Sequence, residues 1–138
     1  MKIVICGSMK FSEEMLDLKL KLNSLGFNQV VVPRNTEKYA IKEKQFEVSS
    51  ESVKNKIDHD LIREYYQEIN SADAVLIANY DKNGVKNYVG GNSFLEAAFA
   101  HVLNKRLYFL NDIPEMSYSD EMKALQPIIL NGDLNQIK

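Results

Sequence analysis

The chain has little cysteine, no tryptophan and no strong excess of either charge. Among its 138 residues are one cysteine and three prolines, and the formal net charge is -2. Cys6 stands alone inside an apolar run, which excludes a disulfide framework and a cysteine-based zinc site. A slightly acidic chain also lacks the basic footprint that binding to a nucleic-acid polymer requires. Any nucleotide partner is therefore expected to be a small molecule.

Long hydrophobic runs are missing as well. The apolar stretch near the N-terminus, "KIVIC", is too short for the hydrophobic region of a signal peptide, and no segment approaches the about 20 apolar residues of a membrane span. A reducing compartment suits the single cysteine. We therefore expect a cytoplasmic protein with no membrane partner. The length and the 45% hydrophobic content predict one domain over residues 1–138.

Short apolar runs alternate with helical patterns along the chain. Strands alternating with helices imply a parallel sheet with helices on both faces. The sequence therefore predicts a single-domain α/β fold with a doubly wound five-stranded parallel sheet, flavodoxin-like or Rossmann-like, in the strand order 2-1-3-4-5. The predicted strands are Lys2–Cys6, Gln29–Pro33, Ala72–Asn79, Arg106–Asn111 and Pro127–Leu130.

One segment has no clear periodicity. Residues 34–52 are charged and weakly patterned, and their sizeable apolar side chains are Tyr39, Ile41, Phe46 and Val48. A stretch of this length without a regular pattern is typical of a functional lid or of a poorly ordered insertion. We expect a mobile lid whose aromatic side chains close over a ligand.

Three loops are expected to meet at one crevice. In doubly wound sheets, ligands bind beyond the carboxyl ends of the strands, where the strand order reverses. The first loop has neither the GxGxxG nor the P-loop pattern, which excludes NAD binding and Walker-type nucleotide hydrolysis. Its glycine and serine can still present backbone N–H groups to a ribose or phosphate, and a simple turn is the alternative. The candidate substrate-binding residues are Gly7, Ser8, Met9, Lys10, Phe11, Asn79, Gly91, Asn92 and Ser93.

The stretch "GGNSFLE", residues 90–96, has two interpretations. Ser93 followed three residues later by Glu96 matches a capping box, in which the two side chains satisfy backbone N–H groups of the first helical turn. A carboxylate behind a glycine loop at the ligand end of a sheet can also act as a nucleophile toward a sugar. The local sequence leaves both interpretations open.

Three segments, "CGSMKF", "SADAVLIAN" and "GGNSFLEAAFA", together resemble the nucleoside 2-deoxyribosyltransferase superfamily, which includes the 2′-deoxynucleoside 5′-monophosphate N-glycosidases. The family pattern in the third segment is a glycine, a threonine, two variable residues and the catalytic glutamate, then small residues two and four positions later. Ser93 matches the threonine, Glu96 the glutamate, and Asn92 replaces the glycine. Ala98 and Ala100 match the small residues. The resemblance implies cleavage or base exchange at the N-glycosidic bond of a nucleoside or nucleoside 5′-monophosphate, with Glu96 as the nucleophile.

The resemblance also implies a second acidic residue, which is altered here. The family places an aspartate eight residues before the aspartate of its third-strand "AD" motif, and the ungapped match is Tyr65. A phenol can donate a hydrogen bond or a proton, but Tyr65 also belongs to the apolar stripe of a helix expected over residues 53–69, where a core role is the alternative. Glu64 and Asp60 lie nearby on that helix. The candidate catalytic residues are Glu96, Asp81 and Tyr65.

Other functions remain open. The glycine pair with its serine and glutamate is similar to the "PGGxGTxxE" loop of the phosphoribohydrolases that release cytokinin bases from nucleotides, although the proline is missing. A non-catalytic nucleotide-binding or sensing domain would keep the crevice and lose the second carboxylate. None of these functions requires a metal or a redox cofactor. The small residues of Ala97–Ala100 would permit close helix packing, and the resemblance implies a site completed across subunits, so a homo-oligomer is expected.

Overall fold

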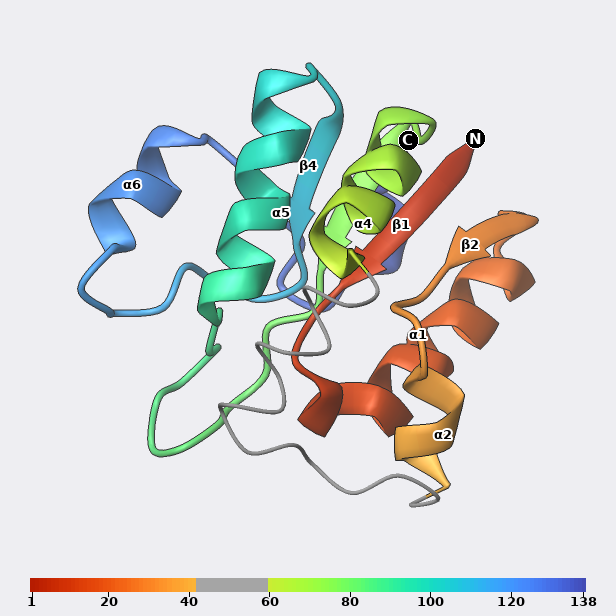
Figure 1. Cartoon of the computed structure of the whole chain (residues 1–138), viewed down its shortest axis with the longest axis horizontal. Helices are drawn as coiled ribbons and strands as arrows, with labels where there is room; N and C mark the ends of the chain where they lie inside the picture. Colours follow the sequence, from red (N-terminus) through yellow and green to blue (C-terminus); the bar gives the residue numbers. More distant parts are fainter. Residues whose placement is uncertain (42–59) are drawn as a thin grey trace.

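A five-stranded parallel sheet organises the chain in the computed structural model, which describes residues 1–41 and 60–138. The strand order is β2-β1-β3-β4-β5, and helices lie on both faces of the sheet (Figure 1). The predicted α/β fold, its parallel sheet and its strand order are therefore confirmed. The strands are β1 (Lys2–Cys6), β2 (Gln29–Val31), β3 (Ala74–Ile77), β4 (Arg106–Phe109) and β5 (Ile128–Ile129).

The helices divide between the two faces of the sheet. Helix α1 packs on one face, and helices α4, α5 and α6 pack on the other. Among the described residues, no helix is both long and apolar enough to cross a bilayer. The helices are α1 (Ser12–Ser24), α2 (Thr36–Ala40), α4 (Leu61–Asn70), α5 (Gly91–Val102) and α6 (Ser119–Ala124), with 3-10 turns η1 (Met9–Phe11) and η2 (Leu134–Gln136).

Successive side chains of β1 enter two different hydrophobic clusters. Ile3 and Ile5 pack with the residues of α1, whereas Val4 and Cys6 pack with residues of α4 and α5. All four are 0% exposed. Because successive side chains of a strand point to opposite faces, this alternation places Cys6, the last residue of β1, on the same side of the sheet as α5.

The segment predicted as a lid or insertion, residues 34–52, is described only in part. Its first residues form the short helix α2, which begins after Asn35 in a left-handed conformation (φ 67°). Residues 42–52 lie outside the described residues, as does the first part of the helix that we expected over residues 53–69. The described part of that helix is α4.

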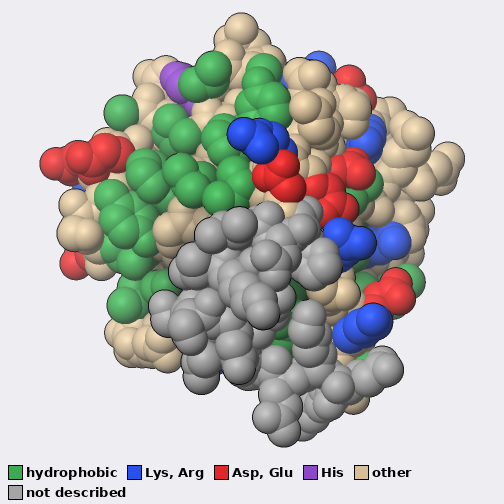
Figure 2. Space-filling model, viewed as in Figure 1, with side chains coloured by type: hydrophobic (Ala, Val, Ile, Leu, Met, Phe, Trp, Pro, Cys, Tyr) green, Lys and Arg blue, Asp and Glu red, His purple; other side chains and the backbone are tan. Residues whose placement is uncertain are grey.

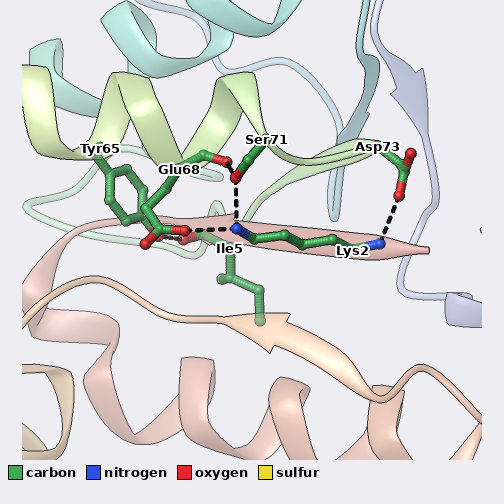
Figure 3. Close-up of polar contacts among 6 residues, drawn as sticks. All are labelled: Lys2, Ile5, Tyr65, Glu68, Ser71 and Asp73. Atoms are coloured by element: carbon green, nitrogen blue, oxygen red, sulfur yellow. Dashed lines mark hydrogen bonds and ion pairs between the residues drawn. The ribbon is translucent and has the colours of Figure 1, made fainter.

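Polar contacts tie α4 to the beginning of β1 (Figure 3). The ammonium group of Lys2 lies 2.9 Å from a carboxylate oxygen of Glu68 and donates to the Ser71 hydroxyl at 2.6 Å. The backbone N–H of Lys2 donates to the Asp73 carboxylate at 2.8 Å, which gives Asp73 a structural role at the start of the third strand. These contacts set the position of α4 along β1, and therefore the position of Tyr65.

Candidate active site

Helix α5 begins earlier than the capping pattern predicted. Its N-cap is Gly90, an extended residue (φ −75°, ψ 170°), and no side chain caps the helix. A β-carbon at Gly90 would lie 3.2 Å from the Tyr88 ring, so the close approach of this ring favours a glycine at the N-cap. Ser93 consequently lies inside the first turn and Glu96 in the second, and the predicted capping box is wrong.

Glu96 is turned into the protein instead. The residue is 8% exposed, and the thiol of Cys6 donates a hydrogen bond to its carboxylate. Burial, followed by the charge of Glu96 and this hydrogen bond, raises the pKa of the Cys6 thiol well above its ordinary value. A carboxylate that is not needed as a helix cap therefore lies at the carboxyl end of β1, where the ligand was expected.

Tyr65 brings α4 to the same point. Its hydroxyl group donates to the carbonyl oxygen of Ile5 on β1 (Figure 3). The hydroxyl end is buried although the residue as a whole is partly exposed. Burial, then the charges of Cys6 and Glu96, raise the pKa of Tyr65 well above its ordinary value, so the phenol is neutral at neutral pH. We call Cys6, Tyr65 and Glu96, which come from three elements, the Glu96 cluster.

The other acidic candidates on α4 face the surface. Asp60 pairs with Arg63 at 3.1 Å, and these side chains are 54% and 83% exposed. Glu64 pairs with Arg34 at 3.2 Å, with exposed fractions of 45% and 55%. Exposed ion pairs of this kind contribute little to stability. Of the candidates on α4, the structure therefore places Tyr65 beside Glu96.

Asn79 and Asp81 hold the loop after β3. The buried Asn79 amide donates to the carbonyl oxygens of Asn111 and Asp112 at 2.9 and 3.0 Å, and its oxygen accepts the N–H of Asn111 at 2.9 Å. The exposed carboxylate of Asp81 accepts the backbone N–H of Asn87 at 3.0 Å. Both predicted site residues therefore have structural partners, and the Asn79 side chain connects the ends of β3 and β4.

The predicted binding loop after β1 is tightly packed. A β-carbon at Gly7 would lie 3.0 Å from the Met15 sulfur and 3.1 Å from the Ala78 carbonyl oxygen, so this close packing favours a glycine. The side chains of Met9 and Phe11 pack with the hydrophobic cluster that contains Ile3, Ile5 and the buried residues of α1. Phe11 is buried and Met9 is partly buried, so Phe11 can offer a ligand its backbone but not its side chain.

Ser8, at the start of this loop, accepts two hydrogen bonds. The Ser8 hydroxyl oxygen accepts the backbone N–H of Lys10 at 3.3 Å and caps the turn η1. The ammonium group of Lys82, from the loop after β3, donates to the same oxygen at 3.0 Å. The sequence patterns indicated no role for Lys82, because the pairing of these two loops depends on the neighbouring positions of β1 and β3.

The residues Gly91, Asn92 and Ser93 form the first turn of α5. The first N–H groups of a helix have no acceptor within the helix, and the positive end of the helix dipole attracts anions. Gly91 and Asn92 are exposed, whereas Ser93 is 5% exposed. The predicted binding residues therefore lie one turn from Glu96 on the same helix.

Two of the small residues of α5 face the sheet. Ala97 and Ala100 are 0% exposed and belong to the cluster that contains Cys6, so they are not available for packing against another subunit. Hydrophobic side chains do gather on the surface over α5 and α6 (Figure 2). Leu95 and Val102 on α5 are 44% and 74% exposed. Any contact between subunits through α5 would use these exposed residues and not Ala97 or Ala100.

A surface hollow lies away from the Glu96 cluster. It is lined by residues at the carboxyl end of α5 and around β5, among them His101, Lys105 and Ile128. None of the predicted site residues lines it. Within residues 1–41 and 60–138, no group of three or more His, Cys, Asp or Glu residues is placed to hold a metal ion.

The fold and the site define an α/β protein in which a buried carboxylate lies with a thiol and a phenol where the strand order reverses. No family model, curated protein or solved structure matches the chain. The family resemblance therefore stays a hypothesis that depends on the three sequence segments.

Alkaline pH is expected to destabilise the protein. Burial is the first cause of the raised pKa values of Cys6, Tyr65 and Tyr80, the last of which is raised to about 12. A raised pKa means that the folded state holds the proton more tightly than the unfolded state. The contribution of these three groups to the free energy of unfolding should therefore be constant below the ordinary values of 9.0 and 10.0 and fall as the pH rises above them.

Urea denaturation measures this fall when it is repeated at pH values about one unit apart, from pH 7 to pH 11.5. In the Tyr80→Phe protein the fall above pH 10 should be shallower, because one of the raised groups is gone. An unfolding free energy that stays constant to pH 11.5 would contradict the burial of these groups.

Proposed function

We propose that the protein cleaves or exchanges the N-glycosidic bond of a nucleoside or nucleoside 5′-monophosphate, with Glu96 as the nucleophile. The observation that carries the proposal is that Glu96 is buried at the carboxyl end of β1 and does not cap its helix. Breaking this bond develops positive charge at C1′, which a nearby carboxylate can stabilise or trap as a glycosyl ester. The resemblance to the deoxyribosyltransferase superfamily supports the same role.

The reaction would proceed in two displacements. A carboxylate oxygen of Glu96 forms a bond to C1′, while the bond from C1′ to the base breaks and the base leaves with the electron pair and takes up a proton. A water molecule or a second base then attacks C1′ and releases the carboxylate. Because the cluster is buried, charges interact there more strongly than in water.

Cys6 and Tyr65 would hold the nucleophile in place. The neutral thiol donates to the carboxylate, and the neutral phenol is anchored to the Ile5 carbonyl. A phenol whose pKa is raised cannot act as a base at neutral pH, so Tyr65 is a positioning residue in this proposal. The N–H groups at the start of α5 are suited to a sugar hydroxyl or a phosphate.

The proposal also covers the partner, the cofactors, the location and the oligomeric state of the enzyme. The partner is a small molecule, no metal or redox cofactor takes part, and the protein is cytoplasmic. A homo-oligomer is also part of the proposal, through the exposed hydrophobic residues Leu95 and Val102.

Base release tests the proposed reaction. The protein is incubated with a panel of ribo- and deoxyribonucleosides and their 5′-monophosphates, with and without an acceptor base, and free or exchanged base is measured by chromatography. Release that depends on Glu96 supports the proposal. Release that continues unchanged in the Glu96→Gln protein would overturn it.

A non-catalytic nucleotide-binding domain is the second candidate. The observation that favours it is that a tyrosine, anchored to the backbone, stands where the resembled family has its second carboxylate. Binding of a nucleotide without release of its base, across the whole panel, would favour this function over catalysis. Release from ribonucleotides alone would instead favour the phosphoribohydrolase-like reaction.

The Tyr65→Phe protein should be both less stable and slower. Removing the hydroxyl leaves the Ile5 carbonyl without this donor, which is expected to lower the free energy of unfolding by about 1–2 kcal/mol. Without the Tyr65 hydroxyl, the Glu96 carboxylate is held less firmly in its reactive position, which should slow base release by about tenfold. Urea denaturation and base release measure the two effects. Tyr66→Phe is the control, because this neighbouring ring packs edge-on against Phe99 on α5. Equal effects of the two changes would contradict the positioning role.

A further inference from the structure

Lys82 connects two loops at the carboxyl end of the sheet. Its ammonium group donates to the Ser8 hydroxyl oxygen at 3.0 Å and lies 4.7 Å from the centre of the Tyr88 ring. Ser8 follows β1 and Lys82 follows β3, and these two strands are neighbours where the strand order reverses. The side chain therefore has a defined position at the point where a doubly wound sheet binds its ligand.

The partners of Lys82 position its charge without neutralising it. A hydroxyl group and an aromatic ring are both neutral, and none of the ion pairs within residues 1–41 and 60–138 involves Lys82. A second cation, Lys10, is close enough to repel the Lys82 ammonium group. Burial, and then the positive charge of Lys10, lower the pKa of Lys82. A bound anion would relieve both the repulsion and the loss of hydration.

Lys82 and Glu96 both contact residues at the end of β1. Ser8, its partner, is two residues along the chain from Cys6, whose thiol contacts Glu96. Two residues of extended chain span at most about 7 Å. The backbone positions from which the ammonium group and the carboxylate are reached therefore lie close together at one end of the sheet, where a nucleotide would have to present both its 5′-phosphate and its C1′.

We infer that Lys82 binds the phosphate group of a nucleoside 5′-monophosphate and so selects the phosphorylated substrate over the free nucleoside. The inference rests on the proposed function for the identity of the ligand. A phosphate monoester carries about 1.5–2 negative charges at neutral pH, and an ammonium group binds it with a charge-assisted hydrogen bond. Lys82 is then a specificity-determining residue, separate from the Glu96 cluster.

Calorimetric binding to the inactive Glu96→Gln protein tests the inference without turnover. The probes are the common ribo- and deoxyribonucleoside 5′-monophosphates, each paired with its free nucleoside, and inorganic phosphate alone. Lys82→Met in this background should weaken monophosphate binding by about 10- to 100-fold, the effect of losing a charged hydrogen bond. Nucleoside binding should change by less than about twofold, because the nucleoside has no phosphate to lose.

Two further variants serve as controls. Lys86→Met removes the same charge from an exposed position in the same loop and should leave monophosphate binding within about twofold of the parent. Lys82→Arg keeps the charge and should restore most of the affinity, whereas a merely structural role for the lysine would not distinguish phosphate from nucleoside. Thermal unfolding of each variant shows that the proteins compared are folded.

The outcomes separate this inference from the proposed function. Base release from nucleosides and monophosphates alike, with no effect of Lys82→Met on binding, would overturn the inference and leave the reaction in place. Phosphate-dependent binding through Lys82 without any base release would uphold the inference and overturn the reaction. Equal losses for monophosphate and nucleoside, or no binding of any monophosphate, would also overturn the inference.

Discussion

The Glu96→Gln protein is expected to release base at least about 1,000-fold more slowly than the unaltered protein. Glutamine has nearly the same size as glutamate, but its amide is a poor nucleophile and carries no charge to stabilise the developing positive charge at C1′. Single-turnover base release, followed by chromatography, measures the chemical step directly.

Glu64→Gln is the matched control for this change. It removes the same charge from a half-exposed position on α4, and its partner there is the surface residue Arg34. The expected rate is within about twofold of the unaltered protein, because exposed ion pairs have small effects. If both variants, or neither, lost activity, Glu96 could not be assigned as the nucleophile.

The Asn79→Ala protein is expected to lose about 2–4 kcal/mol of its free energy of unfolding. Asn79 is 0% exposed, and its side chain bonds three backbone groups of Asn111 and Asp112. Alanine would leave these partly buried backbone groups with fewer partners, and polar groups that lose a hydrogen bond away from water are costly. Urea denaturation at neutral pH measures the loss.

Asn23→Ala provides the comparison for Asn79. This asparagine is exposed on α1, so its replacement should change the free energy of unfolding by no more than about 0.5 kcal/mol. For Asn79→Ala, near-normal stability together with weaker nucleotide binding would contradict the structural role and would mean that Asn79 contacts the substrate, as the sequence predicted.

The fold could be predicted because its signals are local and repeated. Each buried strand is a short apolar run, as in "KIVIC" and "AVLI", and the chain leaves each run through a turn. The rules for parallel crossovers then leave few strand orders to consider. The prediction therefore needed no knowledge of individual contacts.

The start of α5 could not be predicted in the same way. The serine and glutamate of "GGNSFLE" match a capping box at the level of spacing. The helix starts at Gly91 because Gly90 can take the N-cap position beside the Tyr88 ring, a contact that spacing does not encode. This difference of three residues changes Glu96 from a surface cap into a buried carboxylate.

Local pattern in the chain was sufficient for the order of strands and helices and for the end of the sheet at which the candidate residues lie. Pattern could not reveal that Cys6, Tyr65 and Glu96 share one buried cluster, or that Lys82 lies against Ser8. These residues are far apart in sequence, and their burial and mutual charges arise when α4 and α5 pack against β1. Periodicity records which side of an element is apolar, whereas the chemistry of a site depends on which elements meet.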